Sequence, residues 1–334
     1  MGWYRAVGRR FFFAMEPETA HSMARALLSV PLPWRRIGGA PRDPRLTLDL
    51  AGVGLENPIG LAAGFDKRGD RTRALGALGF GYVVAGTFTL RPRPGNEKPR
   101  VVRIQEQGAV VNAMGMPNPG AEEAARLLAR GRRGRCPRFA SLADEAIEDA
   151  ARALELLDPH VDGFELNASS PNAGWAHEVS HVGVLTRELV ARTRRPVFVK
   201  LPPFTNDEER RTVLAMAEVA QSGGAAALTC SNTIPVEEPR LARGRGGLSG
   251  RPLAARTPTI VREVRSATGG ALPINACGGL SSAAEALACL DAGATTVQLY
   301  TSLLFEGPGV VGAIARGLAR ELSTRGTSMR ALVA

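Results

Sequence analysis

Two carboxamides and two hydroxyls lie close together at residues 167–172, which read Asn-Ala-Ser-Ser-Pro-Asn. They directly follow a largely apolar run at 161–166 that is typical of a buried strand. Parallel α/β folds bind their ligands at the carboxyl ends of strands, and Pro171 restricts the turn so that the Ser170 hydroxyl is held at a fixed angle. A bare Asn-Ser pair more often forms a turn that only closes a strand. The density of polar groups here favours a ligand site instead.

Other predicted strands also end in glycine, hydroxyl or lysine residues. Glycine turns after the last two strands of a barrel commonly bind a phosphate through backbone N–H groups. Taken alone, Lys200 could be an ion-paired core lysine, Lys67 a surface residue and Gly278-Gly279 a plain turn. Their joint placement predicts one shared site. The strand ends are 62–67 (Ala-Ala-Gly-Phe-Asp-Lys), Thr87, Lys200, 231–233 (Ser-Asn-Thr), 277–279 (Cys-Gly-Gly) and 300–302 (Tyr-Thr-Ser).

This pattern predicts a cofactor that carries a phosphate and has a flat body. Flavin mononucleotide (FMN) fits it better than a dinucleotide, because the sequence has no Rossmann fingerprint. We expect no metal site, because the four cysteines are scattered without the spacing of metal ligands. We expect them to be reduced and structural.

The elements that must position these residues alternate between apolar strand-like runs and segments of helical composition, such as 121–128, 143–157 and 282–292. Eight alternations over most of the chain predict a (β/α)8 barrel rather than a doubly wound sheet. Residues 47–50 and 53–55 predict a hairpin that closes the bottom of the barrel. The predicted strands are 58–63, 82–86, 139–142, 163–166, 197–201, 225–229, 273–276 and 296–299.

Composition limits the class of protein. A chain of 334 residues with 44% hydrophobic residues is soluble and globular, with a sizeable core. No apolar run is long enough to cross a bilayer and no signal-peptide core is present, so we expect a cytosolic chain. The net charge of +10 is compatible with an anionic membrane surface. We exclude nucleic acid as a partner, because few aromatic residues are available for stacking and no binding module is present.

Residues 1–42 differ from the barrel at 43–334. They predict two short helices rich in apolar and arginine side chains, the second beginning at Glu16-Pro17-Glu18 with proline and acids in its first turn. Either a small packing module or an interfacial membrane anchor would have this composition. The apolar positions are Tyr4, Val7, Phe11, Phe12 and Met15 in the first helix, and Ala20, Met23, Ala24, Leu27 and Leu28 in the second.

Eight stretches are together specific to one family, although each would be weak alone. They are 16–21, 60–67, 91–96, 99–103, 167–172, 231–233, 246–253 and 297–300. With them the chain resembles the membrane-associated, quinone-dependent (class 2) dihydroorotate dehydrogenases over nearly its whole length. The resemblance implies a peripheral location on the inner face of the cell membrane. It also implies that the N-terminal helices hold the quinone and contact the anionic membrane surface.

The resemblance further implies roles for individual residues. His21 and Arg103 would lie near the quinone, with Tyr300 between it and the flavin. The substrate, dihydroorotate or an analogue, would contact Lys67, Asn112, Met116, Asn167, Asn172, Asn232 and Thr233. FMN would be held by Ala63, Gly64, Lys67, Thr87, Asn167, Lys200, Ser231, Gly250, Gly279, Tyr300 and Thr301.

Ser170 stands where the family has its catalytic base. It would accept a proton from one ring carbon while a hydride leaves the next carbon for the flavin. Lys200 would stabilise negative charge on the reduced flavin near N1. Lys67 and the asparagines would align the reacting atoms.

Three segments differ from the family pattern. Residues 138–144 (Arg-Phe-Ala-Ser-Leu-Ala-Asp) replace Gly-x-Asn-x-Gly-Lys-Asn, so one flavin hydrogen bond is missing or comes from Ser141. Residues 112–116 (Asn-Ala-Met-Gly-Met) replace Asn-Arg-x-Gly-Phe, and 173–177 (Ala-Gly-Trp-Ala-His) lack the threonine that helps to relay the proton.

Two readings follow from these differences. The chain oxidises dihydroorotate to orotate in pyrimidine biosynthesis, or it is a paralogous flavin dehydrogenase for another cyclic amide or dihydro-heterocycle in specialised metabolism. The retained Lys67, Asn112 and Ser170 favour the first, and the changes at Met116, Ala173 and Trp175 favour the second. A catalytically inactive membrane scaffold is a third hypothesis, against which Ser170 and Lys200 argue.

Overall fold

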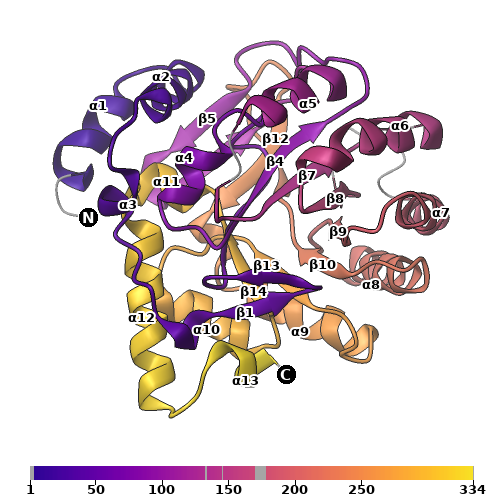
Figure 1. Ribbon diagram of the computed structural model, residues 1–334. Coiled ribbons are helices and arrows are strands. Elements are labelled where there is room, and N and C mark those ends of the chain that lie inside the picture. Colours follow the sequence, from indigo (N-terminus) through magenta and orange to yellow (C-terminus); the bar gives the residue numbers. More distant parts are fainter. Residues whose placement is uncertain (1–3, 132–133, 145, 170–177, 334) are drawn as a thin grey trace.

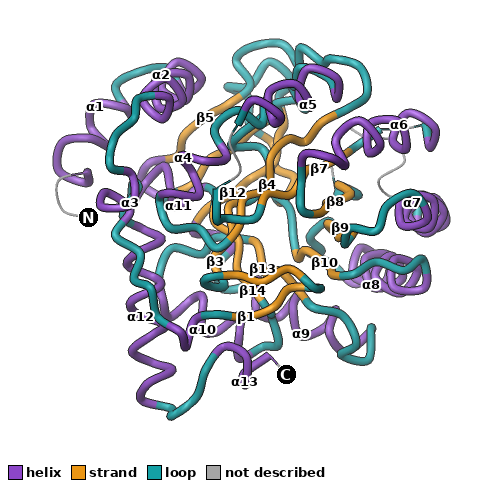
Figure 2. Tube along the Cα trace, viewed as in Figure 1, coloured by secondary structure: helices purple, strands orange, loops and turns teal. Residues whose placement is uncertain are grey.

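The computed structural model describes residues 4–131, 134–144, 146–169 and 178–333. Its centre is a closed barrel of eight parallel strands that follow one another in chain order (Figures 1 and 2). The barrel closes where the last strand pairs with the first, with Val297 opposite Ile59. The (β/α)8 prediction is thereby confirmed. The strands are β3 (Ile59–Leu61), β4 (Tyr82–Phe88), β7 (Arg138–Leu142), β8 (Gly163–Asn167), β9 (Val197–Leu201), β10 (Ala227–Cys230), β13 (Ile274–Cys277) and β14 (Thr296–Leu299).

Helices connect successive strands and cover the outside of the barrel (Figure 1). Parallel neighbours need such crossovers, and strands covered on both faces are apolar throughout. All seven residues of β4 are buried, as this requires. The helices are α4 (Thr72–Ala77), α5 (Ala121–Arg130), α6 (Ile147–Leu157), α7 (Val179–Ala191), α8 (Asp207–Ser222), α9 (Thr257–Ala267), α10 (Ala283–Asp291), α11 (Thr301–Glu306), α12 (Val310–Thr324) and α13 (Met329–Val333).

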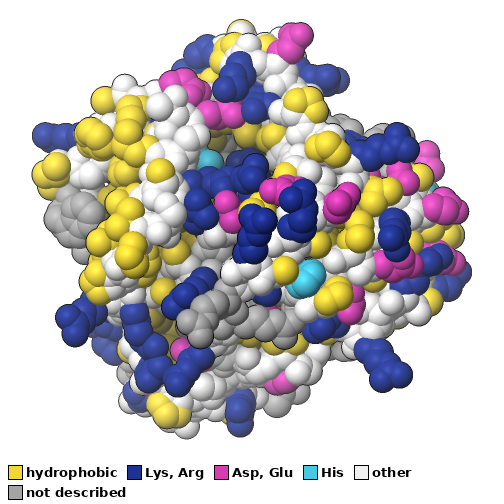
Figure 3. Space-filling model, turned by 45° about the horizontal axis from the view of Figure 1, so that its top comes forward, with side chains coloured by type: hydrophobic (Ala, Val, Ile, Leu, Met, Phe, Trp, Pro, Cys, Tyr) yellow, Lys and Arg dark blue, Asp and Glu magenta, His cyan; other side chains and the backbone are white. Residues whose placement is uncertain are grey.

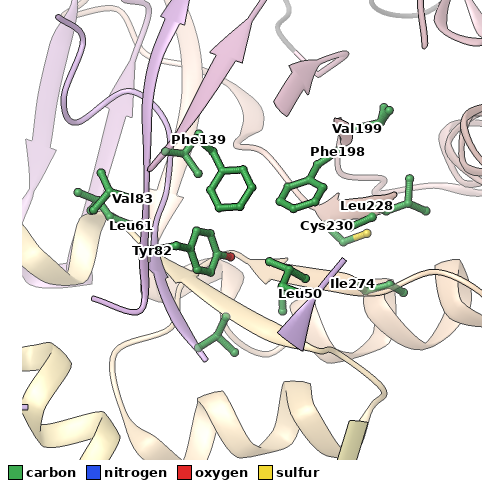
Figure 4. Close-up of a cluster of buried hydrophobic side chains, with 14 of the residues drawn as sticks. Leu50, Leu61, Tyr82, Val83, Phe139, Phe198, Val199, Leu228, Cys230 and Ile274 are labelled. Carbon is green, nitrogen blue, oxygen red and sulfur yellow. The ribbon is translucent and has the colours of Figure 1, made fainter. Parts of the chain in front are cut away.

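Aromatic rings fill the lower part of the barrel (Figure 4). The rings of Tyr82 and Phe139 have centroids 5.6 Å apart, and those of Phe139 and Phe198 are 4.8 Å apart. Glycine makes room for them: a Cβ on Gly60 would lie 2.3 Å from the Tyr82 ring, and one on Gly163 would lie 2.6 Å from the Phe139 ring. These two glycines therefore permit a layer of rings that larger residues would exclude.

The predicted hairpin is also confirmed. β1 (Leu48–Leu50) and β2 (Val53–Leu55) are antiparallel, with Leu48 opposite Leu55. Leu48 and Leu50 are buried while Asp49 between them is exposed, which is the alternation of a strand with one covered face. Leu50 points towards the rings of the barrel core in Figure 4.

A second sheet was not predicted from the sequence. It is antiparallel, in the order β11-β12-β6-β5, and its strands come from the segments that follow β4 and β10 at the carboxyl ends of the barrel strands. Val111, Ala113 and Leu241 form a separate small core beneath it. Its strands are β5 (Val101–Ile104), β6 (Ala109–Asn112), β11 (Ile234–Glu237) and β12 (Arg245–Gly250).

The predicted helix at 143–157 is wrong at its start. The helix α6 begins at Ile147, whereas Ala143 and Asp144 belong to the loop that leaves β7. The Asp144 carboxylate accepts a hydrogen bond from the Leu90 backbone N–H at 2.7 Å. It therefore fastens this loop to the segment after β4.

The N-terminal region forms the two predicted helices and a third. The first consists of a π-helical turn (Tyr4–Gly8) that continues into α1 (Arg9–Phe13). The second is α2 (Pro17–Ser29), where the Glu16 carboxylate accepts a hydrogen bond from the Thr19 N–H at 2.9 Å, as the sequence signal for its start requires. The unpredicted third, α3 (Trp34–Gly38), ends at Gly39 with a positive φ of 63°. None of the described helices is both long and apolar enough to cross a membrane.

Polar contacts fasten these helices to the rest of the chain. Glu18 forms a salt bridge with Arg100 at 2.8 Å, and Arg25 forms one with Asp70 at 2.7 Å. Arg103 donates hydrogen bonds to the backbone carbonyls of Phe12 and Met15 at 3.2 and 3.0 Å. Arg103 belongs to β5 and Arg100 directly precedes that strand, so this edge of the second sheet serves as a platform for the N-terminal helices.

His21 on α2 is half-buried in the contact between these helices and the barrel, and its Nε2 atom is buried. Its ring packs edge-on against Phe65, with centroids 5.2 Å apart. Burial, together with the positive charges of Lys67 and Arg25, lowers the pKa of His21 from 6.5 to about 3. The imidazole is therefore neutral in the folded protein at any pH near neutrality.

This burial predicts a pH dependence of stability. The unfolded chain binds a proton on His21 below its usual pKa and the folded chain does not, so stability is lost as pH falls from 6.5 towards 3. Between pH 7.5 and pH 5 this residue should remove about 2 kcal/mol of unfolding free energy. Urea unfolding at both pH values should show a correspondingly smaller loss in His21→Asn. Equal losses in the two proteins would contradict the burial argument.

Candidate active site

One cavity of about 770 Å³ extends from the N-terminal helices to the carboxyl ends of the barrel strands. Every site residue predicted from the sequence that falls in the described part of the chain lines this cavity. Ser170 and Asn172 lie outside the described residues. Those that line it are His21, Ala63, Gly64, Lys67, Thr87, Arg103, Asn112, Met116, Asn167, Lys200, Ser231, Asn232, Thr233, Gly250, Gly279, Tyr300 and Thr301.

Hydrogen bonds join the ends of three strands at the barrel mouth. Asn167 at the end of β8 donates from Nδ2 to Thr87 Oγ1 of β4 at 3.1 Å. Its Oδ1 accepts from Ser169 Oγ at 2.7 Å, and Asn232 after β10 donates to that same Oγ at 2.9 Å. The amides are therefore held at fixed angles before any ligand binds.

Ser141 supports this network from below. It is fully buried on β7, and its Oγ lies 3.0 Å from Thr87 Oγ1. It is not among the residues that line the cavity. Ser141 therefore holds Thr87 in place at the cavity wall.

Two lysines, the buried Lys200 and the half-buried Lys67, bring positive charge to the cavity. Lys200 on β9 lies opposite Asn167 on β8 and Thr229 on β10. Burial alone would lower the pKa of Lys200, but the Cys277 sulfur and the Glu165 carboxylate raise it above its usual value. Burial, assisted by nearby arginines, lowers the pKa of Lys67 to about 8. Both ammonium groups are therefore mainly charged at neutral pH.

The loops after β12 and β13 approach each other closely enough to need glycine. Gly250 and Gly279 have positive φ angles of 99° and 76°. A Cβ on Gly250 would lie 2.3 Å from the Gly108 carbonyl oxygen, and one on Gly279 would lie 2.4 Å from the Ala254 nitrogen. Nearby, Ser302 Oγ is buried without a hydrogen-bond partner among the described residues. Exposed backbone and a free hydroxyl together suit the oxygens of a phosphate.

The other end of the cavity is lined by rings. His21, Phe65 and Tyr300 form a continuous series of edge-on contacts, with centroid distances of 5.2 and 5.8 Å. The Tyr300 hydroxyl donates to the Gly64 carbonyl at 3.3 Å. His21 Nε2 is buried and has no hydrogen-bond partner among the described residues. A neutral imidazole nitrogen is thus available to a polar group that enters from this side.

Arg103 has a structural task besides lining the cavity. It donates hydrogen bonds to the backbone carbonyls of Phe12 and Met15. Its guanidinium also lies 4.8 Å from the centre of the Phe13 ring. The arginine thereby closes one side of the cavity with the N-terminal helices.

Among the polar residues that line the cavity without a role predicted from the sequence are Gln298 and Ser249. Gln298 precedes Tyr300 by two positions on β14, and alternation along the strand would have placed its side chain inside the barrel. Ser249 Oγ lies 2.9 Å from Thr301 Oγ1 and belongs to the unpredicted second sheet. In the sequence, Ser249 is connected to the site only through the stretch 246–253 and its neighbour Gly250, because the sheet itself was not predicted.

Comparison with known proteins gives a consistent result. The family model described as dihydroorotate dehydrogenase matches residues 45–322. Curated relatives named dihydroorotate dehydrogenase (quinone) include that of Erythrobacter litoralis, 38% identical over 94% of both chains. That of Brucella ovis is 35% identical over 98% of this chain and 94% of its own length.

Solved structures agree with this match. The dihydroorotate dehydrogenase of Eimeria tenella in complex with ferulenol has a TM-score of 0.84 and 26% identity, with 95% of both chains covered. The ligand-free form has the same TM-score, 27% identity and coverage of 95% of this chain and 98% of that one. This chain therefore belongs to the dihydroorotate dehydrogenase family and is similar over nearly its whole length to the quinone-dependent members.

Proposed function

We propose that this chain oxidises dihydroorotate to orotate, with FMN as its cofactor and a quinone as its electron acceptor. The observation that carries the proposal is one continuous cavity with two different ends. The end at the barrel mouth is lined by lysines and amides, which suit a small anionic heterocycle. The end at the N-terminal helices is lined by aromatic rings and the neutral His21, which suit an apolar ring with carbonyl oxygens.

FMN fits the residues between these two ends. Gly64 has a positive φ of 97° and carries no side chain that would keep a flat ring from the backbone. The free hydroxyl of Ser302 and the loops at Gly250 and Gly279 suit its phosphate. Lys200 would interact with its ring through an ammonium group. When bound, FMN supplies the two-electron chemistry that no amino-acid side chain provides.

The substrate would lie between Lys67 and the amides. Lys67 would pair with its carboxylate, and Asn112, Asn232 and Thr233 would bind its ring amides. Asn232 is already oriented, because its Oδ1 accepts from the Thr233 N–H at 2.9 Å and its Nδ2 donates to Ser169. These contacts would orient the reacting carbons and reduce the entropic cost of reaction.

Ser170 would accept the proton that leaves the substrate. It directly follows Ser169, whose hydroxyl is hydrogen-bonded to both Asn167 and Asn232. A serine is a weak base, so its contribution would depend on this orientation and on the exclusion of water. Lys200 would stabilise the negative charge that develops as the substrate is oxidised.

Residues 1–42 would bind the quinone and attach the protein to the inner face of the cell membrane. Hydrophobic side chains gather over these helices on the left of the molecule in Figure 3. This apolar surface suits an anionic bilayer, because the same segment also exposes Arg10, Arg35 and Arg36. Its exposed members are Val7, Phe11, Met23, Leu27, Val30 and Leu32.

Dihydroorotate as the substrate is supported by the names of the relatives described above, and none of them favours a different cyclic amide. The purified protein should be yellow, and dihydroorotate should bleach it under anaerobic conditions. Dihydrouracil, which lacks the carboxylate that Lys67 would bind, should bleach it far more slowly. Protein that stays yellow with dihydroorotate but is bleached by another dihydropyrimidine would overturn this substrate assignment.

Ser170→Ala should slow flavin reduction by about 10²- to 10⁴-fold, because the proton acceptor acts in the transition state. It should change the substrate dissociation constant by less than about tenfold. Stopped-flow absorbance under anaerobic conditions measures both quantities. Ser169→Ala is the matched control, since it loosens Asn167 and Asn232 and should weaken binding more than Ser170→Ala does. Equal losses of rate and binding in Ser170→Ala would remove Ser170 from the role of base.

The double variant Phe11→Ser/Leu27→Ser should bind anionic vesicles at least about tenfold more weakly, because each buried apolar side chain contributes about 1.5–3 kcal/mol. Vesicle co-sedimentation measures this affinity. Val184→Ser is the control, because Val184 is 42% exposed on α7, outside the N-terminal helices. If all these proteins bind equally, the N-terminal helices are a packing module and not an anchor.

A further inference from the structure

A buried carboxylate lies inside the barrel below the proposed flavin site. Glu165 on β8 has 0% of its surface exposed. Its side chain is on the same face of the strand as that of Asn167, which lies opposite Lys200 on β9. Glu165 Oε2 accepts hydrogen bonds from Thr229 on β10 and Gln298 on β14, at 2.8 and 3.4 Å. Contacts to these two strands place the carboxylate in the barrel interior, one layer below Lys200.

A series of hydrogen bonds ends on this carboxylate. Tyr82 OH lies 2.7 Å from Thr296 Oγ1, and Thr296 donates to Asn275 Oδ1 at 2.7 Å. Asn275 Nδ2 donates to Thr229 Oγ1 at 3.3 Å, and Thr229 donates to Glu165 Oε2. Since the Thr296 proton points to Asn275, Tyr82 is the donor of the first bond. Every donor is therefore directed towards Glu165, which stabilises negative charge there.

This carboxylate is only partly satisfied by its neighbours. Its Oε1 is buried and has no hydrogen-bond partner among the described residues. A buried charge of this kind destabilises a fold unless a cation offsets it. Aliphatic residues would fill the same space at lower cost. The position therefore suggests a role for the charge itself.

The cation that interacts electrostatically with Glu165 is Lys200, on the neighbouring strand β9. Burial works against the charged form of this lysine, while the Cys277 sulfur and Glu165 favour it and raise its pKa. The other titratable groups that interact with Glu165 are Cys277 and Tyr82. Burial raises the pKa of Cys277 and of Tyr82, so both are neutral at neutral pH. At neutral pH the negative charge that acts on Lys200 is therefore that of Glu165.

We propose that Glu165 is a positioning residue that keeps Lys200 protonated while the cofactor is still oxidised. A cation is then in place before negative charge develops in the site, and no proton has to arrive during the reaction. This inference rests on the proposed function, because it requires a flavin next to Lys200. A purely structural Glu165 would instead only fasten the strands of the barrel core to one another.

The midpoint potential of bound FMN, measured as a function of pH, separates these two roles. A lysine that is neutral in oxidised protein and charged in reduced protein takes up one additional proton, which steepens the dependence on pH. In Glu165→Gln this steepening should begin about 1 pH unit or more below its onset in the unaltered protein. Glu165→Asp keeps the negative charge, so its onset should lie close to that of the unaltered protein. Tyr82→Phe disturbs the same hydrogen bonds but keeps the carboxylate, and should leave the onset unchanged.

An unchanged onset in Glu165→Gln with FMN bound, or an equal shift in Tyr82→Phe, would overturn the proposal. Photoreduction sets the potential without dihydroorotate, so an error in the substrate assignment would not affect this result. Failure of the protein to bind FMN would instead refute the proposed function.

Thermal unfolding provides a second test, which can be made even if the single variant Glu165→Gln does not fold. Lys200→Met should lower the melting temperature, because it leaves the Glu165 carboxylate buried without its cation. Adding Glu165→Gln to Lys200→Met should raise it again. A double variant that melts no higher than Lys200→Met, or that does not fold, would show that Glu165 serves the core and not Lys200.

Discussion

The closure of the barrel is the constraint on which the rest of the structure depends. Pairing of β14 with β3 leaves no free edge, so each strand has a fixed register with two neighbours. That register sets Lys200 beside Asn167 on one side and Thr229 on the other. A slip of one residue in β9 would turn the ammonium group to the outside of the barrel. The chemistry of the site is therefore a consequence of strand pairing and not of loop conformation alone.

Closure also determines what the interior can contain. At the bottom, rings fill the space that Gly60 and Gly163 leave open, and the hairpin at Leu50 covers them. Above this apolar layer comes a polar one, which contains Glu165 and the series of donors directed to it. The cavity begins above that polar layer. Hydrogen bonds thus replace apolar contacts towards the mouth of the barrel. The charged and polar residues of the site rest on rigidly packed layers below them.

Some of this organisation could be predicted from the sequence, for physical reasons. Strands buried on both faces are continuous apolar runs, so the barrel and the strand-end residues could be recognised from composition. The second sheet could not, because its strands are only four to six residues long and cover only a small core. The helix at 143–157 was placed too early because the composition of Ala143 and Asp144 does not reveal that the carboxylate holds Leu90.

The interior position of Glu165 was hidden for a related reason. A single acid in an apolar run is compatible with an exposed strand residue, and its partners Thr229, Asn275 and Thr296 come from three other strands. Only the closed register brings these four side chains together. The same limit applies to Ser141, whose contact with Thr87 depends on the pairing of β7 with β4.

The N-terminal helices have to meet two demands that conflict. A surface suited to a bilayer leaves Phe11 and Leu27 exposed, which does not by itself hold helices of this length on a barrel. Ion pairs on another part of the same helices resolve the conflict, because Glu18 and Arg25 bind Arg100 and Asp70 while the apolar side chains stay free. His21 lies between Glu18 and Arg25 in sequence and lines the cavity, so attachment of the helix also forms the cavity wall beside which a quinone would bind. In this arrangement the attachment of the helices and the shape of the cavity are set by the same few contacts.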